Sequence, residues 1–382
     1  MKRIRSELKC IYPDKSLTKL NFNDLFILLK NGHSVFNSRE FNIHVVIIAK
    51  RFERCLDLKD FVKQFAYSSL ETELMAKFYI EVLKVSKCKL LCFDNAKYDK
   101  HSLSGLILNR IYEAFRLNSF LKVLSLVKSL RDEKFNREEV IKSLTYHPSL
   151  ICLDLSQNNL FSKIVNVAVA IKTFLVKNKT LLKLNLNTNR PDSESTQLIF
   201  SGLAQNTSLK QFFYSNNEIS GHDCKHISDM LSINKSLVLL CLDNNQISDL
   251  GFEHLCLGLT QNNTLTRMTL QKNTFTNKII DDIYYIFEKN KVFNQMDLSK
   301  NVNLYFTNEE KKKLSTKLFD NVITEQLFNS NKEKKTSENS DKNLESQQKL
   351  QEDYDDGFAI IVSERYRIDE QRGRGRGRDY FR

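Results

Sequence analysis

A nine-residue phrase recurs through the middle of the chain at a nearly constant period. Its form is Leu-x-x-Leu-x-Leu-x-x-Asn, and successive copies begin 31, 28, 28, 28 and 28 residues apart. The six copies begin at Leu150, Leu181, Leu209, Leu237, Leu265 and Phe293. A fixed period of this length indicates one small unit repeated in a stack, because no single unit can bury its own apolar side. We therefore expect a solenoid in which the leucines at positions 1, 4 and 6 face a shared core.

The second half of each unit has the spacing of a helix. Apolar residues fall ten and six positions before the next position 1, for example Ile199 and Leu203 before Leu209. Such spacing indicates one buried helical face. An Asn falls three positions before position 1 in most units, and we expect it to end the helix in a left-handed conformation. His147 replaces it in one unit. The same offsets extend the pattern back to strands that start at Cys88 and Leu121, which gives eight strands in all.

This phrase and period resemble the ribonuclease-inhibitor type of leucine-rich repeat, over about residues 88–303. The resemblance implies a right-handed α/β solenoid shaped as a horseshoe, with a parallel sheet on the concave side and helices on the convex side. The chain departs from the family pattern in two units. The unit that starts at Leu150 has three extra residues, and the unit that starts at Cys88 is 33 residues long.

The pattern divides the chain into four parts. Residues 1–86 are expected to form a mostly helical N-terminal cap or degenerate repeats, with a strand at Val45–Ala49 and helices at Phe61–Phe65 and Leu70–Leu83. The repeat domain covers 87–303. A capping helix is expected over 304–328, starting at Thr307. The polar tail 329–382 is expected to be disordered and contains an Arg-Gly segment.

Charge and cysteine usage narrow the class of protein. The net charge is +12, and residues 1–149 hold 27 basic against 17 acidic residues. This excess indicates either an anionic partner or a lysine-rich solvated surface. The eight cysteines show no disulfide spacing, which favours a reducing compartment. No secretory signal and no membrane-length apolar run is found, so we expect a cytoplasmic protein; secretion of a microbial effector into a host cell is a second hypothesis.

The strand residues between the inward leucines are the candidate binding site. In the middle repeats, Phe213, Leu239 and Cys241 should lie side by side on the concave face within a polar rim. An apolar cluster with such a rim is typical of a protein-binding hot spot. The candidate partner-binding residues are Lys183, Gln211, Phe213, Leu239, Cys241, Asp243, Arg267, Thr269 and Gln271. The alternative is that Phe213 only packs on its neighbours or is covered by a tail.

Other hypotheses rest on isolated features. The Arg-Gly segment could bind RNA or an acidic partner through Arg372, Arg374, Arg376 and Arg378. Arg190 could act on a small GTPase, because Ran GTPase-activating proteins share this repeat type, and tropomodulin-like actin regulators have similar repeats. His222, Cys224 and His226 do not share one helical face, which argues against zinc. No enzyme or cofactor motif occurs, so we expect a binding protein without catalysis, cofactor or metal.

Overall fold

The computed structural model describes residues 55–57, 90–92, 116–131, 136–161 and 166–310, which belong to the first of two compact units, Met1–Phe328. Several sequence-based predictions therefore lie outside the described residues. They are the strand at Val45–Ala49, the helices at Phe61–Phe65 and Leu70–Leu83, and the tail 329–382 with its Arg-Gly segment.

The strands form one parallel sheet in which sequence order is also spatial order. Each strand is three residues long and occupies positions 3 to 5 of a repeat. The strands are β1 (Cys55–Asp57), β2 (Leu90–Cys92), β3 (Val123–Ser125), β4 (Cys152–Asp154), β5 (Lys183–Asn185), β6 (Gln211–Phe213), β7 (Leu239–Cys241), β8 (Arg267–Thr269) and β9 (Gln295–Asp297). The register joins position 4 to position 4 in every pair, as in Leu153 beside Leu184. Leu91 pairs with Leu124, which confirms the strand predicted from Cys88.

Strand β1 was not among the eight predicted strands, and the sheet has nine. Leu56 pairs with Leu91 and so occupies position 4 of an additional repeat. A signal for this repeat exists in the sequence, because residues 55–58 read Cys-Leu-Asp-Leu, as do residues 152–155. The phrase was missed because position 1 of this repeat is Glu53 instead of an apolar residue and position 9 is Phe61 instead of Asn, so only part of the pattern is present.

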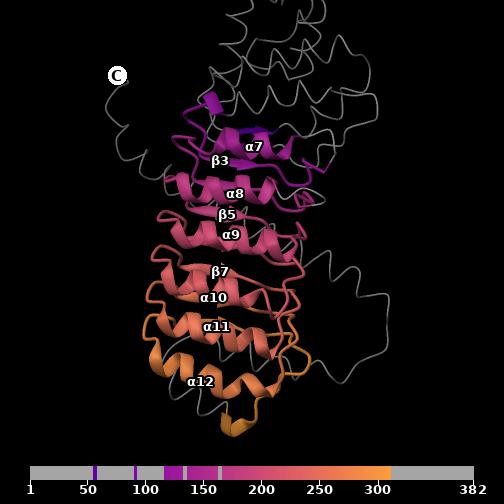
Figure 1. Ribbon diagram of the computed structural model, residues 1–382, viewed down its shortest axis with the longest axis vertical. Helices are drawn as coiled ribbons and strands as arrows, with labels where there is room; N and C mark the ends of the chain where they lie inside the picture. The colour runs from indigo at the N-terminus through magenta and orange to yellow at the C-terminus, as the bar shows by residue number, and fades with distance from the viewer. Residues whose placement is uncertain (1–54, 58–89, 93–115, 132–135, 162–165, 311–382) are drawn as a thin grey trace, which may run out of the picture. The chain divides into compact units, whose positions relative to one another are not determined.

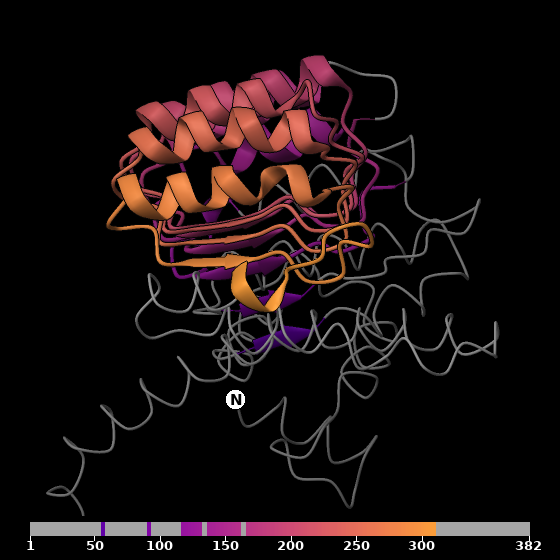
Figure 2. The ribbon, with the colours of Figure 1, turned by 90° about the horizontal axis from the view of Figure 1, so that it is seen from below.

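Helices alternate with the strands and stack in chain order (Figure 1). They are α7 (Arg137–Leu144), α8 (Asn166–Lys177), α9 (Ser193–Gln205), α10 (Cys224–Ile233), α11 (Asp249–Gln261) and α12 (Ile280–Lys289), the last preceded by the 3-10 turn η1 (Asn277–Ile279). Figure 2 shows that these helices lie on one side of the sheet. The predicted architecture, a parallel sheet alternating with helices in a repeat solenoid, is confirmed.

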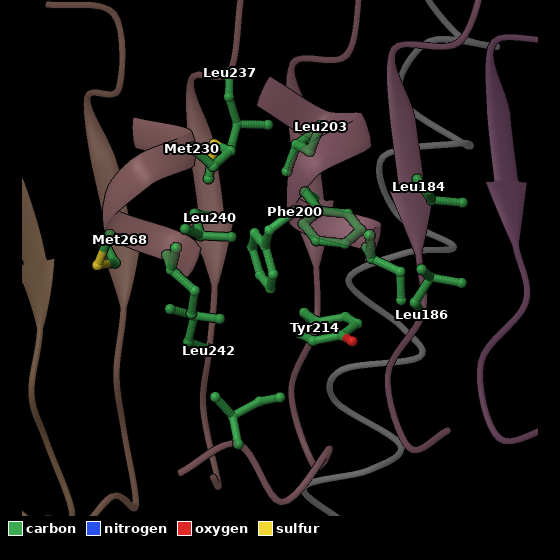
Figure 3. Packing of buried hydrophobic residues seen from close by; sticks show 14 of the residues in the cluster. Leu184, Leu186, Phe200, Leu203, Tyr214, Met230, Leu237, Leu240, Leu242 and Met268 are labelled. Atoms are coloured by element: carbon green, nitrogen blue, oxygen red, sulfur yellow. The ribbon is translucent and has the colours of Figure 1, made fainter. Parts of the chain in front are cut away.

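The core fills the layer between the strands and the helices. Position 1, 4 and 6 side chains are buried throughout the six regular repeats, and the helix residues ten and six before position 1 face them. Figure 3 shows Leu184, Leu186 and Tyr214 of the strand side against Phe200 of α9. Phe200 meets the Tyr214 ring edge-on, with centroids 5.3 Å apart. Burial of these side chains across neighbouring repeats is what holds the stack together.

The position 9 asparagines form a buried ladder that joins each turn to the next. Asn217 is typical. Its Nδ2 donates to the carbonyl of Leu186 at 3.1 Å, and its Oδ1 accepts from the backbone N–H groups of Asn189 at 2.7 Å and Arg190 at 3.1 Å. These backbone groups lie where the chain leaves the strand and has no sheet partner, so the side-chain amide supplies the partner they need.

A second ladder lies where each helix returns to the next strand. Asn206 donates from Nδ2 to the carbonyl of Leu175 at 2.6 Å, and its Oδ1 accepts from the N–H of Leu209 at 2.7 Å. The predicted left-handed conformation is wrong: Asn206 has φ −74° and ψ 135°, which is extended. The Asn ends the helix through its side-chain bonds, not through its backbone shape. His147 takes the same role, since its Nδ1 accepts from the N–H of Leu150 at 3.0 Å.

Left-handed residues occur instead at position 8, next to the first ladder. They are Lys128, Gln157, Thr188, Asn216, Asn244, Lys272 and Lys300, all with φ between 50° and 62°; Asn159, Arg190 and Glu218 at position 10 are left-handed as well. None is a glycine. The turn at position 8 redirects the chain so that the following Asn points inward, and ladder bonds offset the cost of the left-handed backbone.

Two glycines allow pairs of neighbouring helices to approach closely. A Cβ on Gly202 of α9 would lie 2.9 Å from Cα of Lys172 in α8, and a Cβ on Gly258 of α11 would lie 2.8 Å from Cα of Ser228 in α10. The repeat pattern alone does not indicate this role. Both glycines fall seven residues before position 1, where the adjacent repeats carry the large side chains of Phe174, Met230 and Ile286.

The described part of the chain ends with the start of a further helix. Thr307 Oγ1 accepts from the N–H of Glu310 at 3.2 Å, and the Glu310 carboxylate accepts from the N–H of Thr307 at 2.6 Å. This reciprocal arrangement is a capping box. The helix start predicted at Thr307 is present, and the rest of the expected capping helix lies outside the described residues.

Candidate partner-binding face

One face of the sheet is turned away from helices α7–α12, and we call it the open face (Figure 2). Side chains alternate between the two faces of a strand, so positions 4 and 6 enter the core while positions 3, 5 and 7 belong to the open face. The register places equivalent positions of neighbouring strands side by side. Phe213 therefore lies beside Cys241, and Leu239 lies between Gln211 and Arg267.

The carboxylates of the open face are bonded within the protein. Asp154 accepts from the Ser156 N–H at 2.8 Å and from Asn185 Nδ2 at 3.0 Å. Asp243 accepts from the Gln271 N–H and from Thr269 Oγ1, both at 2.8 Å.

The third carboxylate, Asp297, is bonded in the same way. It accepts from the Ser299 N–H at 3.0 Å and from Gln271 Nε2 at 2.5 Å. Both oxygens of all three carboxylates therefore have a hydrogen-bond donor. Buried acceptors need such partners, and here the network fixes their positions before any ligand arrives.

The apolar and cationic residues of the open face have a different environment. Phe213 and Leu239 are half-buried and Arg267 is exposed. Lys183 Nζ lies over the Phe213 ring, 4.9 Å from its centroid, which is a cation–π contact. Phe213 remains half-buried beside this contact. Phe213, Leu239, Arg267 and the half-buried Gln211 thus form one contiguous group across β6, β7 and β8.

Four other candidate residues are buried, which sequence alone did not reveal. Cys241, Asp243, Thr269 and Lys183 are all less than one-tenth exposed. Cys241 was expected to be part of an exposed apolar cluster, but Phe213 and Thr269 flank it on the adjacent strands. Burial, with the nearby Asp243 charge, raises the pKa of the Cys241 thiol to about 12. Gln271 is half-buried and is held by Asp297.

Residues of the alternative hypotheses lie elsewhere. Arg190 is exposed and left-handed, and its Nε lies 3.2 Å from the Glu218 carboxylate, which is also exposed. An exposed pair of this kind contributes little to stability. The Arg-Gly residues Arg372, Arg374, Arg376 and Arg378 lie outside the described residues.

The His-Asp-Cys-Lys-His stretch at 222–226 is used for structure. Burial alone would raise the pKa of Asp223, but hydrogen bonds from Ser193 and Ser220 outweigh it and hold that pKa below its usual value. Cys224 is buried, and its thiol donates to the carbonyl of Ser220 at 3.5 Å. Across the described parts of the chain, no three His, Cys, Asp or Glu residues are placed to hold a metal ion.

The fold and the open face define a class, an α/β repeat solenoid with a continuous parallel sheet. No family model and no curated protein matches the chain. Among solved structures, a chain titled "Leiomodin-1 Actin-Binding Site 2 (ABS2)" matches with a TM-score of 0.35 and 21% identity, over 41% of this chain and 88% of that chain. No conclusion about the partners of this protein follows from a match of that size. None of the helices in the described residues is long and apolar enough to cross a bilayer.

Proposed function

We propose that this protein is an interaction scaffold that binds a protein partner on the open face of the repeats from Leu181 to Lys291. The observation that carries the proposal is the contiguous group of Gln211, Phe213, Leu239 and Arg267. It combines half-buried apolar side chains with an exposed cation on a surface that the helices leave uncovered. Aromatic residues and Arg are enriched at protein interfaces relative to the rest of the surface.

The hydrogen-bonded carboxylates support a rigid site with a defined charge. Because Asp154, Asp243 and Asp297 already accept bonds from their neighbours, Arg267 supplies the exposed charge of the group. The partner should therefore present an apolar side chain over Leu239 and Phe213 and a carboxylate opposite Arg267. A preorganised surface of this kind binds with little ordering cost.

The test is affinity capture with chemical cross-linking, using the full chain and two matched double variants. Leu239→Glu with Arg267→Glu changes the open face. Leu257→Glu with Lys225→Glu makes the same two changes on the exposed side of α11 and α10. We expect one set of captured proteins to survive nuclease treatment, persist with the α10/α11 variant and disappear with the open-face variant.

Two results would refute the proposal. One is equal loss of the captured set in both double variants, which would indicate a general effect of charge. The other is capture that survives the open-face changes but is abolished by nuclease or by removal of residues 365–382. That result would assign binding to the Arg-Gly segment and to nucleic acid. GTP hydrolysis by a bound GTPase that is lost in Arg190→Ala would instead support the regulator hypothesis.

A further inference from the structure

One lateral edge of the solenoid consists of the connections from each helix to the next strand, and we call it the helix-to-strand edge. Each connection starts four residues before position 1 and ends one residue after it. The connections are 117–122, 146–151, 177–182, 205–210, 233–238, 261–266 and 289–294. The second asparagine ladder holds successive connections together: Asn234, for example, donates from Nδ2 to the carbonyl of Asn206 at 3.1 Å. The edge is therefore a rigid surface about 30 Å long at the usual strand spacing.

The charge on this edge has a single sign. The seven connections contain seven lysines and no Asp or Glu. Six of the lysines are exposed, and Lys122 is half-buried. The exposed ones are Lys177, Lys179, Lys210, Lys235, Lys289 and Lys291. Lys142, in the last turn of α7 just before the connection 146–151, forms ion pairs with Glu138 and Glu139.

Carboxylates gather on the helical side instead. Glu253 of α11 and Asp281 and Asp282 of α12 lie close enough that burial, Glu253 and Asp281 together raise the pKa of Asp282. At the border of the edge, Arg116 lies one residue before the first connection and Glu288 one residue before the last, so these two charges lie at opposite ends of the stack. The positive charge of the edge is therefore a local property and not a reflection of the overall composition.

Large apolar side chains are exposed on the same edge. Tyr146 is 76% exposed, Ile233 60%, Leu117 48% and Phe120 46%, and Val238 and Val292 are also exposed. Most of these side chains are aliphatic. They have no role in the core, which the position 1, 4 and 6 residues fill.

Helix dipoles explain only part of this arrangement. Helices α7–α12 all end at this edge, and cations are favoured near helix C-termini. That accounts for Lys177 and Lys289, which lie in last turns. It does not account for Lys179, Lys235 and Lys291 beyond the helix ends, where ladder asparagines already bond the last carbonyls. It does not explain exposed isoleucine and valine either.

We propose that the helix-to-strand edge docks on the surface of an anionic lipid bilayer. Lysine ammonium groups bind anionic headgroups, and neighbouring apolar side chains enter the boundary between headgroups and acyl chains. A nucleic acid would gain from the lysines but gains little from Ile233, Val238 and Val292. Single-stranded nucleic acid is held by aromatic stacking and by Arg, and the seven connections contain no Arg and two exposed aromatic side chains, Tyr146 and Phe120, against seven lysines. The proposal is independent of the open face.

The first test measures sedimentation of the full chain with phosphatidylcholine vesicles that contain 0% or about 30% phosphatidylserine. At the higher content the negative surface potential of the vesicle attracts lysines near its surface. Lys179→Gln, Lys235→Gln and Lys291→Gln together change the edge. Lys225→Gln, Lys278→Gln and Lys300→Gln remove the same charge from other exposed sites. Each lysine near an anionic surface contributes about five-fold in affinity, so we expect about a 100-fold loss for the edge variant and less than about five-fold for the control.

The second test reports position. The chain contains no tryptophan, so one introduced Trp is a specific fluorescent reporter. With phosphatidylserine vesicles, the emission of Ile233→Trp should shift to shorter wavelength, because the side chain leaves water. The emission of Leu257→Trp, on the exposed side of α11, should not shift.

Three outcomes would overturn the proposal. The two triple variants could lose vesicle binding equally, the Ile233→Trp emission could stay unshifted on vesicles that bind the protein, or the chain could fail to bind anionic vesicles at all. If vesicles fail while single-stranded poly(U) binds and the edge variant loses that binding, the edge is a nucleic-acid site instead. Unchanged thermal unfolding of each variant excludes misfolding as the cause.

Discussion

Replacing Asn217 with Ala should destabilise the solenoid strongly, because this one side chain is a hydrogen-bond partner of three backbone groups. Asn217 is fully buried. Its loss removes the acceptor for the N–H groups of Asn189 and Arg190 and one of two donors to the Leu186 carbonyl. That carbonyl keeps its bond from Asn189 Nδ2 at 3.0 Å. The net effect is therefore two N–H groups without a partner, of which the one on Asn189 is buried.

The magnitude follows from that count. A buried donor left without a partner costs about 1–3 kcal/mol, and a partly exposed one costs less because water reaches it. Adding the loss of the side chain's own packing, we expect Asn217→Ala to lower the free energy of unfolding by about 2–5 kcal/mol. The value should lie well above that of an ordinary surface substitution.

Urea unfolding followed by circular dichroism measures this difference, with Asn294→Ala as the matched control. Asn294 is an exposed Asn in the same domain, and its variant should stay within about 0.5 kcal/mol of the parent. Repeat domains need not unfold in one step, so the onset of unfolding should be compared as well as the midpoint. A cost for Asn217→Ala no larger than that for Asn294→Ala would refute the reasoning, since it would mean that the ladder bonds contribute nothing net.

Three further predictions rest on single contacts. Gly258→Ala should lower the free energy of unfolding by about 1–3 kcal/mol in urea, despite the better helix propensity of Ala, because its Cβ would lie 2.8 Å from backbone atoms of Ser228. The neighbouring substitution Leu257→Ala should be near neutral. Equal effects of the two substitutions would contradict the close-packing role of Gly258. His147→Asn should keep the free energy of unfolding of the parent, whereas His147→Leu should lower it by about 1–3 kcal/mol, because only Asn restores an acceptor for the Leu150 N–H. Similar losses in both variants would be inconsistent with the capping role of His147. Cys241, whose pKa burial raises to about 12, should resist iodoacetamide at pH 8 until urea unfolds the chain, as read by peptide mass spectrometry, and rapid labelling of the folded chain would show the thiol to be accessible. Since the folded pKa lies above the unfolded value of about 8.5, the contribution of this thiol to stability is complete below pH 8.5 and is lost as the pH rises toward 12.

Much of the fold could be predicted because the core residues recur at fixed positions of the repeat. Leu153 and Leu184 recur at one position, and the sheet register joins them as the phrase predicts. The conformation of the ladder asparagines could not be predicted, since Asn suits both a left-handed turn and a side-chain cap, and only the bonds of Asn206 distinguish the two. Strand β1 was missed because the charged Glu53 stands at position 1 of its repeat, where the other repeats have an apolar residue.

The candidate face was harder to predict for a physical reason. Alternation along a strand indicates that Cys241 and Leu239 share a face, but not how much of each the adjacent strands cover. Cys241 is small and lies between Phe213 and Thr269, so it is buried, whereas Leu239 is larger and remains half-exposed beside Arg267. The size of the neighbours decides exposure, and that information comes from the register of three strands together.

The two proposed surfaces meet at consecutive residues. Val238 is the last residue of its connection and belongs to the helix-to-strand edge. Leu239 is the first residue of β7 and belongs to the open face, so the two surfaces adjoin at this bond. A protein partner over Leu239 and Arg267 would approach at right angles to the helix-bearing layer, whereas a bilayer would lie along the side of the stack. The two ligands would compete near Lys210, Val238 and Thr266, where connections of the edge meet strands β6 to β8. If both surfaces act as proposed, vesicles that carry anionic lipid should capture the protein with its partner still bound, and open-face variants should lose the partner without leaving the vesicles.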